Sequence, residues 1–144
     1  MPTDQVKAAM RRRRFDRRPE EVAAARRFVV SGLVRGSEVW ETAQLLVSET
    51  VTSSLDQSGP DSGSGSLEVG YALDGRRLLV EVSDDGGPAR LRRRIHDAGA
   101  AKGHGLELVQ ALASRWGVRE SSAGRIIWFE VDLTGGDGRA QKTS

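Results

Sequence analysis

The chain has 144 residues, a formal net charge of +2 and no cysteine, with 38% hydrophobic and 29% charged residues. This length suits one domain with its own core. The lack of cysteine excludes disulfides and thiolate metal sites, and two histidines, His96 and His104, argue against a zinc enzyme. No apolar run approaches the roughly 20 residues that span a bilayer. The basic N-terminus lacks the apolar segment of a secretion signal, so we expect a cytoplasmic protein.

The first residues of the chain are polar and strongly basic. Arginine occupies positions 11–14, 17 and 18. Such a run either contacts nucleic acid or an acidic partner, or forms a solvated arm. No nucleic-acid-binding motif accompanies the arginines, so we favour a flexible arm over residues 1–14 and do not expect nucleic-acid binding.

Two helices are predicted next. Pro19 suits the first turn of a helix that runs to about Val34 and is closed by Gly36. Ser37 is a natural N-cap for the second helix. That helix carries an apolar stripe, Val39, Ala43, Leu46, Val47 and Val51, and a mostly polar stripe, Thr42, Leu45, Glu49, Thr52, Ser53 and Asp56. The polar stripe faces either water or a site. Residues 57–65 form a flexible linker by composition.

Strands dominate the rest of the chain. Residues 67–73 and 78–82 alternate around Asp74-Gly75, a strong hairpin signal. A turn-rich break and a loop over 89–102 follow. The segment 103–105 opens a helix, along which Leu106, Val109, Leu112 and Trp116 keep helical spacing until Gly117 ends it.

A short strand is expected from Val118 and a last strand over 126–133, before a disordered tail at 134–144. Helices and strands are segregated along the chain and do not alternate. This order predicts an α+β two-layer sandwich, with helices on one face of a mixed, mostly antiparallel sheet. We expect Trp40, Trp116 and Trp128 in or near the core.

Three segments carry the chemistry: residues 46–54 (LVSETVTSS), 80–88 (VEVSDDGGP) and 103–109 (GHGLELV). Each alone is a weak signal. In this order and spacing, together with 111–118 and 124–130, they resemble the N, G1 and G2 boxes of the ATPase fold of gyrase, Hsp90, histidine kinases and mismatch-repair proteins. The nearest group is the small bacterial anti-sigma-factor serine kinases. The resemblance covers residues 15–133.

The resemblance implies a site for ATP or ADP with Mg²⁺. Asp84 matches the carboxylate that accepts the adenine amino group, and Glu49 matches the catalytic general base. Ser53 stands where the family has the Asn that holds Mg²⁺. The remaining nucleotide contacts implied are Gly86, Gly87, Gly103, His104, Gly105 and Leu106, the last four where a helix N-terminus faces the phosphates.

Two positions depart from the family pattern. Ser53 is shorter than Asn, and Ile126 stands where relatives often have a Thr that supports the adenine-binding Asp through a water. Two functions therefore stay open. The first is an ATP-dependent serine/threonine kinase that holds a sigma factor and phosphorylates its antagonist. The second is a catalytically weak relative that regulates a partner by binding alone. The resemblance also implies a homodimer.

Overall fold

The computed structural model describes residues 9–56, 65–84, 106–121 and 124–133. In chain order the elements are β1 (Arg11–Asp16), the 3-10 helix η1 (Pro19–Glu21), α2 (Val22–Val30), α3 (Glu38–Asp56), β2 (Ser66–Leu73), β3 (Arg77–Asp84), α5 (Glu107–Leu112), β4 (Arg115–Ser121) and β5 (Gly124–Asp132). Among the helices that these residues form, none is long and apolar enough to cross a membrane.

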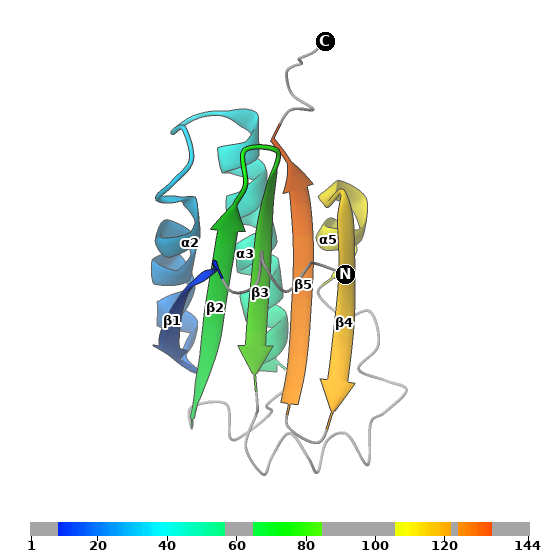
Figure 1. Ribbon diagram of the computed structural model, residues 1–144. Helices are drawn as coiled ribbons and strands as arrows, with labels where there is room; N and C mark the ends of the chain where they lie inside the picture. Colours follow the sequence, from blue (N-terminus) through cyan, green and yellow to red (C-terminus); the bar gives the residue numbers. More distant parts are fainter. Residues whose placement is uncertain (1–8, 57–64, 85–105, 122–123, 134–144) are drawn as a thin grey trace.

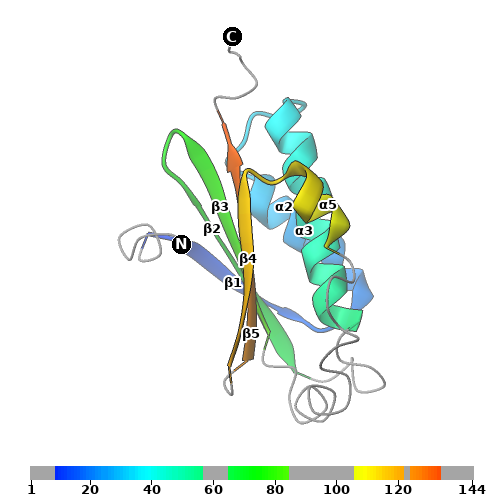
Figure 2. The ribbon, with the colours of Figure 1, turned by 90° about the vertical axis from the view of Figure 1, so that its right-hand side faces the viewer.

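The strands form one sheet in the order β1-β2-β3-β5-β4 (Figure 1), and every neighbouring pair is antiparallel. Helices α2, α3 and α5 cover one face of this sheet (Figure 2). This arrangement confirms the predicted α+β sandwich. The described strands are wholly antiparallel, in keeping with the mostly antiparallel sheet that the sequence predicts.

The core lies between the helices and the sheet. Alternate residues of β2 and β3 turn towards the helices and are buried: Leu67, Val69, Tyr71, Leu78, Val80 and Val82. The apolar stripe of α3 meets them with Ala43, Leu46, Val47 and Val51, as predicted. Period-two alternation in the strands and the three-and-four spacing in the helix thus produce complementary apolar faces.

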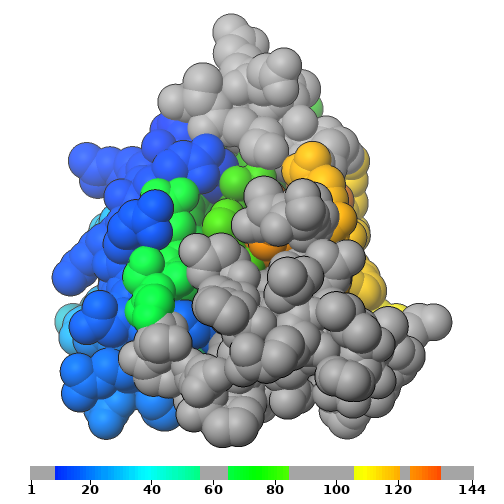
Figure 3. Space-filling model, turned by 90° about the horizontal axis from the view of Figure 1, so that it is seen from below, coloured from blue at the N-terminus to red at the C-terminus, as the bar shows by residue number. Residues whose placement is uncertain are grey.

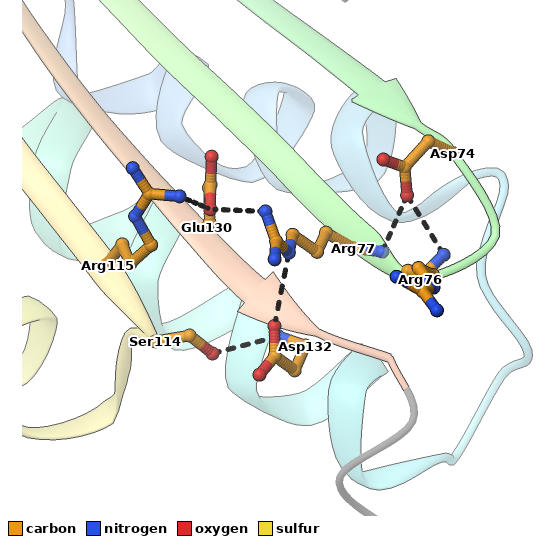
Figure 4. A network of polar contacts seen from close by, with 7 residues as sticks. All are labelled: Asp74, Arg76, Arg77, Ser114, Arg115, Glu130 and Asp132. Carbon is orange, nitrogen blue, oxygen red and sulfur yellow. Dashed lines mark hydrogen bonds and ion pairs between the residues drawn. The ribbon is translucent and has the colours of Figure 1, made fainter. Parts of the chain in front are cut away.

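The opposite face of the sheet carries alternating charges. Figure 4 shows Glu130 of β5 between Arg77 and Arg115, whose Nη1 atoms lie 3.7 and 3.6 Å from its Oε1. Trp128 lies on this same face, directly across from Gly117. It is buried, but by alternation it points away from the helices, whereas Trp40 and Trp116 pack against the core.

Local signals in the sequence are confirmed where they depend on a few residues. The Ser37 hydroxyl accepts a hydrogen bond from the Trp40 backbone N–H at 3.1 Å, as an N-cap should. In the hairpin, the Asp74 carboxylate accepts the backbone N–H groups of Arg76 and Arg77 at 2.9 and 2.8 Å (Figure 4). These two bonds hold the pKa of Asp74 below its ordinary value.

Three expectations were wrong. Residues 11–14, assigned to a flexible arm, form β1, because Arg11–Asp16 pairs in register with Tyr71–Ser66 of β2. The first helix ends at Val30, not near Val34. The helix expected through Trp116 ends at Leu112, because Trp116 joins β4 and pairs with Phe129. Residues 1–8 of the arm, the linker and the tail lie outside the described residues, except that Gly65 precedes β2.

Candidate functional site

Helix α3 carries the two residues expected to act on phosphate and metal. Glu49 and Ser53 are four residues apart and therefore share a face of the helix. Glu49 is half-buried, whereas Ser53 is only 2% exposed. Burial raises the pKa of Glu49, and the nearby carboxylate of Glu107 raises it further.

Glu107 is a neighbour of the site that the sequence analysis did not single out. It lies in the first turn of α5, and α5 packs against α3. The negative charge of Glu107 disfavours ionisation of Glu49. The only signal in the sequence was its position directly after Leu106, within the segment 103–109.

Asp84 is the last residue of β3 and is 4% exposed. Its place in the strand alternation puts it on the helix-facing side, with Val80 and Val82. Arg17 donates through Nη1 to the Asp84 carboxylate and through Nη2 to the Ser54 carbonyl oxygen, the latter at 3.0 Å. One guanidinium thus joins the end of β3 to the last turn of α3.

Arg17 is itself held in place on several sides. Its side chain is 1% exposed, and its backbone N–H donates to the carbonyl of Gly65 at 3.3 Å. Gly65 adopts a φ of 81°, and a Cβ there would lie 3.5 Å from the Arg17 Cδ. No hydrogen bond from the buried Arg17 Nε to a described residue is present. The negative end of the α3 dipole also stabilises a cation at the last carbonyl groups of the helix.

A second arginine lies beside Asp84 in the sheet. Arg125 of β5 is the cross-strand partner of Asp84, and its Nε lies 3.9 Å from Glu120 Oε2. Ile126 pairs instead with Ser83, and the alternation places it on the face away from the helices. In this register Ile126 is therefore not the cross-strand partner of Asp84.

Through Arg17 the structure links Asp84 to the last turn of α3, which carries Ser53, and Glu49 lies one turn earlier on the same helix. Figure 3 shows the molecule from below, relative to Figure 1, where the segment containing β1 (blue) lies along β2 (green). Leu106 is buried against the core and its carbonyl accepts the Gln110 N–H at 2.9 Å. Gly86, Gly87, Gly103, His104 and Gly105 lie outside the described residues. Among the described residues, no group of three or more His, Cys, Asp or Glu is placed to hold a metal ion.

Comparison with known proteins identifies the family. The model of the histidine kinase-like ATPase domain matches residues 15–131. Comparison with curated proteins gave no match. The matched range takes in Arg17, α3 with Glu49 and Ser53, and the end of β3 with Asp84. The match covers most of the chain and agrees with the sandwich described above, so the chain belongs to the histidine kinase-like ATPase domain family.

Proposed function

We propose that this chain is an adenine-nucleotide-binding regulatory domain of the anti-sigma type, with little or no phosphoryl transfer. Its family typically binds ATP with Mg²⁺ and includes anti-sigma factor kinases. The observation that supports the proposal is the link from Asp84, through Arg17, to the last turn of α3, the helix that carries Glu49 and Ser53. Glu49, Ser53 and Asp84 match the catalytic, metal and base positions of the family.

The oxygen donors on α3 suit a weak metal site. Mg²⁺ prefers oxygen ligands in near-octahedral geometry, and Glu49 and Ser53 offer a carboxylate and a hydroxyl one helical turn apart. The Ser53 hydroxyl is short and buried, so it reaches less far than an Asn amide would. We therefore expect Mg²⁺ to add little to nucleotide affinity.

The carboxylate of Asp84, at the position that matches the adenine contact of the family, is already bound by Arg17. The adenine amino group is a neutral donor that needs a carboxylate acceptor, and Arg17 already donates to Asp84. A charged donor makes the stronger hydrogen bond. Adenine therefore fits this position only once Arg17 has left it, and the expected affinity of the wild-type chain is low.

Kinase activity is the second candidate, and Glu49 favours it. A half-buried carboxylate with a raised pKa is a better proton acceptor than an ordinary surface glutamate. Glu49 would take the proton of a serine hydroxyl on a partner protein. The same raised pKa makes this activity rise with pH as Glu49 loses its own proton.

Calorimetric titration with ATP and ADP, with and without Mg²⁺, tests the main proposal. We expect weak binding by the wild type, and Mg²⁺-dependent tightening in Ser53→Asn. Glu49→Gln should leave ADP affinity within about threefold and abolish any phosphorylation of an antagonist. Absence of binding by wild type and Ser53→Asn at millimolar nucleotide, with both proteins folded, would refute nucleotide binding.

The partner in this proposal is a sigma factor or the protein that antagonises the anti-sigma factor. Both act where transcription occurs, which makes the cytoplasm the proposed location. A homodimer belongs to the same proposal. Light scattering at micromolar concentration tests it, since a monomer mass would contradict the dimer, and two-hybrid assays against sigma factors and their antagonists of the same genome test the partner.

A further inference from the structure

We propose that Arg17 is a built-in competitor for the nucleotide base, which keeps Asp84 engaged until the segment between β1 and η1 moves. The inference rests on the proposed function, because it concerns the regulation of that same site. It assigns a role to a residue that none of the predicted motifs contains.

The contacts of Arg17 place it in direct competition with a nucleotide base for the Asp84 carboxylate. Arg17 and Asp84 are 1% and 4% exposed, so their ion pair is shielded from water. The guanidinium is bound at two points, the Asp84 carboxylate and the Ser54 carbonyl. The arginine stem lies near Gly65, since a Cβ added there would lie 3.5 Å from the Arg17 Cδ. A base that uses Asp84 therefore competes with a buried guanidinium that is bound at two points.

The position of Arg17 in the chain indicates how it can be released. It follows β1 directly and precedes η1. Among the strands of the described residues, β1 is terminal and pairs with β2. A terminal strand has fewer sheet contacts than a central one, and Arg17 moves with it. Displacement of β1 would withdraw the guanidinium, which links access to Asp84 with the placement of this basic strand.

Titration of ADP into matched variants tests the inference. Arg17→Gln removes the charge beside Asp84. Arg18→Gln is the matched control, because Arg18 is exposed and its Nε lies 3.8 Å from Oε1 of Glu20, which is also exposed. Arg17→Gln removes the charged hydrogen bond that competes with adenine for Asp84. ADP binding should therefore tighten by about 10- to 100-fold in this variant. Arg18→Gln should match the wild type. Guanine carries an oxygen at the ring position where adenine carries its amino group, so the affinity for GDP should rise less than threefold in Arg17→Gln.

Further variants keep the test decisive. In Arg17→Gln/Asp84→Asn the gain should disappear. If Arg17→Gln does not fold, Arg17→Lys replaces it, because a single ammonium cannot reproduce the fork to Asp84 and Ser54. An ADP affinity of Arg17→Lys at least threefold above wild type then supports the inference, and equal affinity overturns it.

The remaining outcomes separate the two proposals. If wild type and Arg17→Gln bind ADP equally well, nucleotide binding stands and the role of Arg17 is refuted. If no folded variant binds ADP at millimolar concentration, both the proposed function and this inference fail.

Discussion

The buried pair of Arg17 and Asp84 should stabilise the fold, which a ligand-binding carboxylate alone would not do. Asp84→Asn removes the negative charge with little change in volume and leaves the Arg17 cation buried. Loss of one partner of a buried ion pair costs about 3–5 kcal/mol of unfolding free energy. In this variant Arg17 keeps its hydrogen bond to the Ser54 carbonyl, and the negative end of the α3 dipole still stabilises its charge. We therefore expect a loss near the lower end of that range, about 3 kcal/mol.

Urea unfolding monitored by circular dichroism measures this loss. The double variant Arg17→Met/Asp84→Asn should lose less than the sum of the single variants, with a coupling of about 1–3 kcal/mol. Asp132→Asn is the matched control, because its partner Arg77 lies 3.7 Å away and its side chain is 53% exposed. That change should cost less than about 1 kcal/mol. An unfolding free energy of Asp84→Asn equal to that of wild type, or strict additivity, would refute the reasoning.

Three further predictions follow from other parts of the fold. Glu49→Gln should raise the unfolding free energy by less than about 0.5 kcal/mol at pH 7.5. Its raised folded-state pKa means that the ionised group opposes folding, so the difference from wild type should narrow as the pH falls to the ordinary value of 4.5; urea titrations at both pH values check this. Asp74→Ala should cost about 0.5–1 kcal/mol, because the hairpin loses two hydrogen bonds at an exposed turn. Since the pKa of Asp74 is lowered, that cost should shrink as the pH falls below 3.8, as thermal unfolding across pH would show. Gly117→Ala should lower the unfolding free energy by about 1–3 kcal/mol, since its Cβ would come within 2.7 Å of the Trp128 indole; a melting temperature equal to that of wild type would contradict this contact.

Features that depend on a few neighbouring residues could be predicted from the sequence. The Asp74-Gly75 turn, the Ser37 cap and the apolar stripe of α3 follow from local hydrogen bonding and periodicity. The roles of Glu49, Ser53 and Asp84 are implied by the family resemblance, and the structure links Asp84 to the last turn of α3 through Arg17.

Features set by distant contacts could not be predicted. Trp116 fits a helical spacing, but pairing with Phe129 placed it in a strand. Arg17 resembles the five other arginines between positions 11 and 18. Its burial depends on the register of β1 with β2 and on Asp84, which is 67 residues away. No periodicity within the N-terminal segment distinguishes it.

The measurement that tests the central claim most directly is heteronuclear NMR of the wild-type chain during titration with ADP. If the nucleotide binds at Asp84 by displacing Arg17, the Arg17 Nε–H signal and the backbone amides of Ser54 and Asp84 should shift together. The Trp128 indole signal, on the opposite face of the sheet, should stay unchanged. Shifts confined to that opposite face, or no shift at millimolar ADP, would contradict the account.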